Sequence, residues 1–154
     1  MDHEHFMRQA LAQAALAQTA GEVPVGAVVV IDGAVVGAGY NQPITGIDPT
    51  AHAEVVAMRR AATATGNYRL TGATIYVTVE PCLMCVGAMV HARIATVFYG
   101  ATEPRCGAIV SMTSAHEFAG LNHRLAAIGG VLEDECRAII QEFFKGRRSV
   151  GTGL

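Results

Sequence analysis

The sequence predicts a single α/β domain in which helices cover a mixed β-sheet. Two apolar, β-branched segments at 25–31 and 35–40 flank an Asp-Gly dipeptide, which is typical of tight antiparallel hairpins. Farther along, a helix-forming run separates strand-like segments at 74–79 and 96–99, and this order indicates a β-α-β unit with parallel strands. Because one part of the sheet is antiparallel and the other parallel, we expect a mixed sheet.

The helices follow from apolar spacing and from helix-start signals. Near the N-terminus, apolar residues recur at i, i+3, i+4, i+7 and i+8 and predict a first helix: Met7, Ala10, Leu11, Ala14 and Ala15. An Asp-Pro-Thr cluster marks the start of a helix over 51–64, and a proline precedes an apolar helix over 82–91. We expect residues 127–132 to add an edge strand before a last helix over 133–148.

Length and composition agree with one compact domain. A chain of 154 residues with 51% hydrophobic content can bury a substantial core without disulfides. No apolar stretch has the length of a membrane span, and residues 1–5 lack the basic and apolar regions of a signal peptide. Four cysteines also fit a reducing compartment, so we expect a cytoplasmic protein with no membrane contact. The domain is expected to cover 1–148, followed by a loose tail at 149–154.

The strongest chemical signal pairs His-Ala-Glu at 52–54 with Pro-Cys-Leu-Met-Cys at 81–85. His52, Cys82 and Cys85 supply one imidazole and two thiolates, which suit zinc better than calcium or magnesium. A structural zinc site normally has four protein ligands, whereas a catalytic one keeps a position for water. Glu54 is not needed as a ligand and can reach that water as a general acid/base. The pattern therefore predicts a catalytic zinc site.

The remaining histidines and cysteines give weaker signals. A Cys-x-x-Cys pair also occurs in redox proteins and zinc ribbons, but this chain has no second pair to complete a ribbon. Cys106 and Cys136 are expected to be ordinary thiols, and Cys136 shares a helical face with apolar side chains: Ile139, Ile140 and Phe143. Five histidines lack a comparable context and are expected at the surface or in packing: His3, His5, His91, His116 and His123.

The two motifs resemble the signature of the zinc-dependent nucleobase deaminases. Asp-Pro-Thr-Ala-His-Ala-Glu at 48–54 and Glu-Pro-Cys-Leu-Met-Cys-Val-Gly-Ala-Met at 80–89 are similar to strings of the bacterial tRNA-specific adenosine deaminases. Further similar strings lie at 22–27, 67–70 and 120–124. The resemblance implies a three-layer α/β/α cytidine deaminase-like fold, one Zn²⁺ per subunit and a homodimer. It also implies conversion of the wobble adenosine in the anticodon loop of an arginine tRNA to inosine.

In the reaction that the resemblance implies, zinc lowers the pKa of its bound water from about 16 toward about 7. The hydroxide attacks C6 of adenine. Glu54 takes the first proton, passes it to the ring nitrogen, and then helps ammonia to leave. A single carboxylate at this position can serve both directions of proton transfer.

Five residues are candidates for substrate contacts. By resemblance, Asn41 and Val25 contact the base, and the Asn41 amide offers both a donor and an acceptor. From the residues alone, Asn41 also fits a turn before a proline, and Val25 also fits an ordinary strand position. Glu103 stands where the family usually has an aspartate that contacts the sugar, and its carboxylate reaches one methylene farther. Phe144 and Arg147 complete the set at the C-terminal end.

The net charge of −2 and the pI of about 6.3 are not those of a generally basic nucleic-acid binder, so RNA contacts must be local. Lys145, Arg147 and Arg148 follow two phenylalanines and combine charge with stacking, as suits a single-stranded loop. The same cluster also fits a solvated helix end. Scattered arginines can join this surface, particularly if a second subunit contributes: Arg59, Arg60, Arg69 and Arg105.

Two other functions remain open on the sequence. A deaminase of free guanine or cytosine, or of a nucleoside, shares the same zinc core. The absence of basic residues at 45–47 and the glutamate at position 103 weaken the case for tRNA. A catalytically silent RNA-binding or zinc-stabilised partner protein is a further alternative. Glu54 argues against it, because a purely structural zinc site has no use for a proton-shuttling carboxylate.

Overall fold

The computed structural model describes the backbone of residues 1–149 and the side chains through residue 147. The helices and strands follow in the order α1 (His3–Thr19), β1 (Gly26–Ile31), β2 (Ala34–Tyr40), α2 (Ala53–Thr65), β3 (Thr74–Val79), α3 (Leu83–Ala92), β4 (Thr96–Ala101), the short 3-10 helix η1 (Ala115–Glu117), β5 (Ala126–Ile128) and α4 (Glu133–Ser149). Of the tail predicted at 149–154, Ser149 is the last residue of α4, and the others lie outside the described residues.

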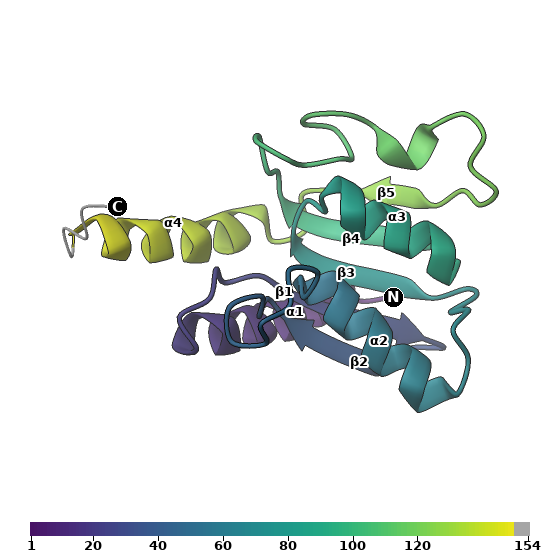
Figure 1. Ribbon diagram of the computed structural model, residues 1–154, viewed down its shortest axis with the longest axis horizontal. Coiled ribbons are helices and arrows are strands. Elements are labelled where there is room, and N and C mark those ends of the chain that lie inside the picture. Colours follow the sequence, from purple (N-terminus) through teal and green to yellow (C-terminus); the bar gives the residue numbers. More distant parts are fainter. Residues whose placement is uncertain (150–154) are drawn as a thin grey trace.

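The five strands form one mixed sheet in the order β2-β1-β3-β4-β5. β1 pairs antiparallel with β2 and β3, whereas β4 pairs parallel with β3 and β5. Helices α2 and α3 lie side by side on one face, and α1 lies on the other (Figure 1). α4 begins on the α1 face, where Cys136 packs against β4, and then extends beyond the sheet (Figure 1). The predicted mixed sheet and its three layers are confirmed.

Side chains of the central strands alternate between two buried clusters. Val28, Val30 and Tyr76 pack under α1, while Val29 and Ile75 pack under α2 and α3. Because both faces of the sheet are covered, the central strands are apolar along nearly their whole length. Among the described residues, no helix is long and apolar enough to cross a membrane.

The predicted hairpin is confirmed, and three predicted boundaries need correction, the first being the end of β4, which lies at Ala101 and not at residue 99. Asp32 and Gly33 both have positive φ, at 50° and 77°, as a type I′ turn requires. Helix α2 starts two residues later than predicted because His52 is extended, with ψ at 154°. The edge strand covers only Ala126–Ile128, not 127–132, since the chain turns through Gly130 and Leu132 at positive φ.

α4 is more exposed than its apolar pattern predicts. Cys136 is fully buried, as expected, and a side chain at Gly100 would overlap its sulfur. The side chains at 139, 140 and 143, however, are only half-buried, because this part of the helix extends past the sheet. The predicted apolar face is therefore covered only at its beginning.

Helix α2 lies unusually close to strand β2. A Cβ atom added at Gly37 would overlap the backbone of Ala57 and Ala61, and one at Gly39 would overlap the backbone of α2 near Ala53 and Ala57. These clashes involve backbone atoms, which cannot rotate away as a flexible side chain can. The two glycines therefore set the position of the helix whose first turn carries Glu54.

We predict that Gly39→Ala destabilises the fold by about 1–3 kcal/mol, the usual cost of overpacking a well-packed interior. Chemical denaturation measures this change. The matched control is Gly87→Ala within α3, where an added Cβ meets nothing within 4 Å. Alanine there should leave the free energy of unfolding unchanged or raise it, because glycine weakens a helix interior. Equal effects of the two substitutions would contradict the prediction.

Candidate active site

The predicted metal ligands lie at the starts of two neighbouring helices. His52 is the N-cap residue of α2, Cys82 is the N-cap residue of α3, and Cys85 lies in the first turn of α3. The first backbone N–H groups of a helix have no partner within the helix and favour nearby negative charge. Both helix starts therefore favour thiolates at this site.

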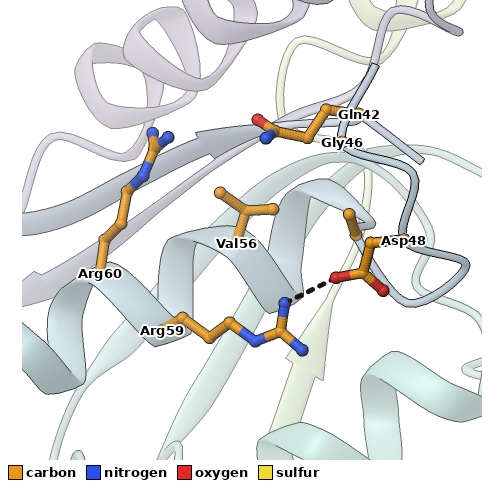
Figure 2. A pocket seen from close by; sticks show the side chains of 7 residues that line it. Gln42, Gly46, Asp48, Val56, Arg59 and Arg60 are labelled. Carbon is orange, nitrogen blue, oxygen red and sulfur yellow. Dashed lines mark hydrogen bonds and ion pairs between the residues drawn. The ribbon is translucent and has the colours of Figure 1, made fainter. Parts of the chain in front are cut away.

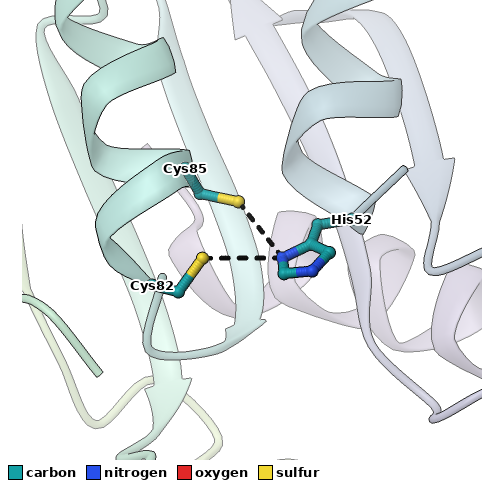
Figure 3. A group of neighbouring side chains, drawn as sticks. All are labelled: His52, Cys82 and Cys85. Atoms are coloured by element: carbon teal, nitrogen blue, oxygen red, sulfur yellow. Dashed lines mark hydrogen bonds between the residues drawn. The ribbon is translucent and has the colours of Figure 1, made fainter. Parts of the chain in front are cut away.

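The three donor atoms are spaced as a zinc ion requires. Nδ1 of His52 lies 3.5 Å from Sγ of Cys82 and 3.6 Å from Sγ of Cys85. All three atoms lie within 4.8 Å of one another, and both sulfurs point toward the imidazole (Figure 3). Tetrahedral zinc, with Zn–S of about 2.3 Å and Zn–N of about 2.0 Å, places such a sulfur and nitrogen about 3.5 Å apart. The residues present fit zinc.

The ligands also carry the charge that a cation needs. A hydrogen bond from the Cys85 thiol lowers the pKa of Cys82 to about 4, and holding that proton raises the pKa of Cys85. The hydrogen bond to Cys82 raises the pKa of His52. The Cys82 thiol is therefore ionised at neutral pH, while Cys85 and His52 keep protons that a bound metal ion would displace.

Glu54 lies beside this cluster without joining it. Its carboxyl belongs to the first turn of α2 and is only 4% exposed. Burial raises its pKa to about 7. The negative charge of Cys82 adds to this increase, whereas the positive charge of His52 opposes it. No carboxylate belongs to the ligand group found among the described residues. A carboxyl group with this pKa can both accept and donate a proton near neutral pH.

Val25 and Asn41, the predicted base contacts, lie next to each other. The backbone N–H of Asn41 donates to the carbonyl of Val25 at 3.0 Å. The next residue, Gln42, donates to the carbonyl of Ala51 at 2.9 Å, and this bond connects the loop to the residue before His52. The structure thus brings both predicted base contacts to the histidine side of the cluster.

Glu103 lies on the cysteine side. Its backbone N–H donates to the carboxylate of Glu80 at 3.0 Å, and its own carboxylate accepts from the backbone N–H of Arg105 at 2.9 Å. Glu80 lies two residues before Cys82, so this contact brings position 103 close to the metal ligands. Its exact role toward a substrate stays a prediction.

The predicted RNA contacts on α4 are placed differently. Phe144 is 42% exposed. Arg147 already has partners, since its guanidinium donates to the carbonyl of Gly21 at 3.2 Å and stacks over Phe143 at 4.8 Å. The side chain of Arg148 lies outside the described residues. The structure therefore does not bring these residues together with the cysteine and histidine cluster.

Two of the scattered arginines line a surface pocket of about 200 Å³ between α2 and the loop before it (Figure 2). Arg59 pairs with Asp48 at 3.1 Å, and Arg60 donates to the carbonyl of Ala38 at 2.9 Å. Both guanidinium groups are exposed but already have protein partners, so the pocket is not an obvious anion site.

Two buried carboxylates were not among the predicted site residues. Glu22, 1% exposed, accepts from the backbone N–H groups of Ile44 and Thr45. Glu80, 3% exposed, accepts from several donors between 103 and 111. Burial raises the pKa of Glu80, but the hydrogen bonds from Ser111 and from backbone N–H groups outweigh this effect and lower the pKa. Its place between an apolar strand and Pro81 is the one sequence signal of such burial.

Comparison with known proteins identifies the family. A family model described as MafB19-like deaminase matches residues 1–148. A tRNA-specific adenosine deaminase from Haemophilus influenzae is 45% identical over 146 residues, which cover 94% of this chain and 84% of the relative. The chain belongs to the family of tRNA-specific adenosine deaminases.

Solved structures support the same family and the cytidine deaminase-like fold. A structure from studies of A-to-I editing by tRNA:A34 deaminases at the wobble position is 41% identical, with a TM-score of 0.85. The match covers 88% of this deaminase chain and 98% of that structure. A guanine deaminase from Bacillus subtilis is 45% identical, but the match covers only 66% of each chain, with a TM-score of 0.63. The tRNA deaminase is thus the more extensive match.

We predict that this deaminase binds one zinc ion per chain through His52, Cys82 and Cys85. Replacing either cysteine by alanine removes one of three ligands and should lower the zinc content to well below one ion per chain. Metal analysis after dialysis measures this. Cys136→Ala is the control, because that buried thiol lies outside the ligand group. Zinc loading should weaken as the pH falls, since the ligands must lose protons to bind. Undiminished zinc in Cys82→Ala protein would reject the assignment.

Proposed function

We propose that this protein hydrolytically deaminates adenosine to inosine at the wobble position of a tRNA anticodon, releasing ammonia. One observation carries the chemistry: a buried carboxyl, Glu54, lies beside a three-residue set whose spacing suits zinc. The proposed tRNA substrate rests on membership in the tRNA-specific adenosine deaminase family, since the similarity extends over nearly the whole chain. By resemblance, the tRNA is an arginine tRNA.

His52, Cys82 and Cys85 would hold the zinc. When bound, zinc supplies a Lewis acid that makes water nucleophilic near neutral pH. Glu54 moves the protons: it accepts one from the attacking water, delivers it to the ring nitrogen of adenine, and assists the leaving amino group. Burial suits the residue to this work, because it raises the pKa of the carboxyl toward the working pH.

The substrate contacts form part of the same proposal. Asn41 reads the edge of the base and Val25 lines its pocket, which is supported by the backbone bond that joins these residues beside His52. Glu103 contacts the sugar from the opposite, cysteine side. Phe144 and Arg147 contact the anticodon loop along α4. For Arg147 this requires that RNA replace or share its bond to Gly21.

We also propose a cytoplasmic homodimer, as the resemblance implies. A groove of about 260 Å³ between α2 and α3 supports an interface with a second copy, since apolar side chains line most of it, among them Val55, Met58, Ala62 and Ala88. A reducing compartment would keep the ligand thiols available for metal.

Light scattering should give about twice the chain mass of 16.1 kDa. A mass of one chain at micromolar concentration would overturn the dimer.

We predict that Glu54→Ala keeps zinc and fold but removes nearly all turnover. The loss should exceed the factor of about 10² to 10⁴ typical of one positioned general acid/base, because this carboxylate serves several proton transfers. Single-turnover ammonia release measures the rate, and metal analysis verifies that zinc remains. Activity within tenfold of the parent would show that another group moves the protons.

We predict that the zinc-loaded protein deaminates an anticodon stem-loop in preference to free adenosine, guanine or cytosine. A flipped base brings its flanking nucleotides with it, and those supply additional contacts. The measurement is kcat/KM for each substrate. The likeness to guanine deaminase makes guanine the informative competitor. A higher kcat/KM for guanine would replace the tRNA proposal with the free-base alternative, and binding without ammonia release would favour a silent RNA-binding protein.

A companion variant tests the α4 contacts. Neutralising Lys145, Arg147 and Arg148 together should weaken binding of the stem-loop and flatten its salt dependence, because fewer phosphate counterions are released. Turnover at saturating RNA should change less. Arg137→Gln, on the same helix but paired with Glu133 at 3.0 Å, is the control and should leave the salt slope unchanged. An unchanged affinity and slope in the triple variant would place the RNA surface elsewhere.

A further inference from the structure

Glu80 is a buried carboxylate at the junction between β3 and the metal ligands. It directly follows β3 and lies two residues before Cys82, and it is 3% exposed. Four backbone N–H groups and one hydroxyl donate to its two oxygens: those of Glu103 at 3.0 Å, Ile109 at 3.0 Å, Val110 at 2.8 Å and Ser111 at 3.0 Å, and the Ser111 side chain.

These donors come from both ends of the segment 103–111, so the Glu80 carboxylate holds the two ends of this loop close together. A buried carboxylate is costly unless it is paired or fully hydrogen-bonded. None of the ion pairs among the described side chains involves Glu80. Backbone N–H groups of the loop and the Ser111 hydroxyl therefore compensate the buried charge, through charge-assisted bonds that are stronger than neutral ones. The loop and the carboxylate depend on each other.

The loop also runs directly alongside a metal ligand. Gly107 forms an antiparallel bridge with Cys82, and the backbone N–H of Ala108 donates to the carbonyl of Pro81 at 2.8 Å. A Cβ atom at Gly107 would overlap the carboxylate of Glu80. Glycine at this position is therefore what lets the loop pass close enough to bond both Glu80 and the backbone beside the ligand.

The loop presents side chains to solvent next to this ligand. Glu103 lies at its start, Val110 is 61% exposed near its end, and Met112 just beyond it is 55% exposed. Exposed apolar side chains on a loop whose backbone pairs with Cys82 offer a surface against which a base or sugar can pack. The position of this surface relative to Cys82 is set by the hydrogen bonds to Glu80.

We propose that Glu80 is a positioning residue for deamination: by gathering the 103–111 loop around one buried carboxylate, it fixes the wall of the site that receives the substrate nucleotide, without touching the substrate itself. The inference rests on the proposed deaminase function and assigns to it a determinant of substrate binding. Glu80 acts through the loop, whereas Glu54 acts on protons.

The test is Glu80→Gln in the zinc-loaded, full-length protein. Glutamine has nearly the same shape, but it replaces one acceptor oxygen with an NH₂ group that faces N–H donors. We expect KM for the stem-loop to rise at least tenfold, kcat to stay within threefold, and zinc to remain at one per chain. Hydrogen exchange should become faster in 103–111. Glu135→Gln is the control: it removes the same charge from an exposed α4 side chain paired with Arg8, and KM should stay unchanged.

Two further variants leave Glu80 in place and keep the test decisive if the glutamine protein folds poorly. Ser111→Ala removes one of the five donors and should raise KM by a smaller factor. Gly107→Ala crowds the carboxylate and should raise KM in the same direction as Glu80→Gln. A merely structural role would instead lower zinc content and kcat together at constant KM, which would overturn the proposal. So would a KM within twofold of the parent in both of these variants.

Failure of the proposed function is visible separately, in the parent protein. If the parent prefers guanine to the stem-loop, the tRNA assignment fails, and the same KM comparison is made with guanine. Positioning by Glu80 then fails if Ser111→Ala and Gly107→Ala both leave the KM for guanine within twofold of the parent.

Discussion

The convergence of two helix starts on one set of donor atoms is the constraint around which the site is organised. His52 and Cys82 cap neighbouring helices, and their side chains meet at 3.5 Å although 30 residues separate them in the chain. This requires α2 and α3 to lie side by side on the sheet, and α2 can approach its strand closely only because Gly37 and Gly39 have no side chains. The packing of these two glycines against α2, which begins directly after His52, thus helps to set the geometry at the ligands.

Three buried glutamates show how environment gives one residue type different roles. Glu54 lacks a full set of donors, so burial dominates and raises its pKa to about 7. Glu80 has five donors, which outweigh burial and keep its pKa low. Glu22 accepts two backbone N–H groups from the loop after Asn41. One carboxyl is therefore suited to proton transfer, while the other two hold the loops on either side of the cluster.

The structure places the proposed catalytic residues apart from the proposed RNA contacts on α4. The candidate zinc ligands and Glu54 lie together at the starts of α2 and α3, whereas Phe144 and Arg147 lie on a helix that extends beyond the sheet (Figure 1). A substrate that contacts both must be larger than a free base. This arrangement agrees with the similarity to relatives that are named tRNA-specific adenosine deaminases. Because the proposed RNA contacts lie outside the catalytic motif, that motif alone could not identify the substrate.

The sequence by itself determined the α/β class, most element boundaries to within a residue, the hairpin turn and the three residues that the fold gathers into a candidate metal site. These features depend on local periodicity, turn chemistry and motif spacing, all of which are readable within short segments. Tertiary structure alone decided what Glu80 binds and that Arg147 is held by Gly21, 126 residues away. It also shortened the edge strand, through glycine and leucine residues at positive φ. Such contacts join distant segments, and no local pattern records which backbone N–H groups a buried carboxylate will meet.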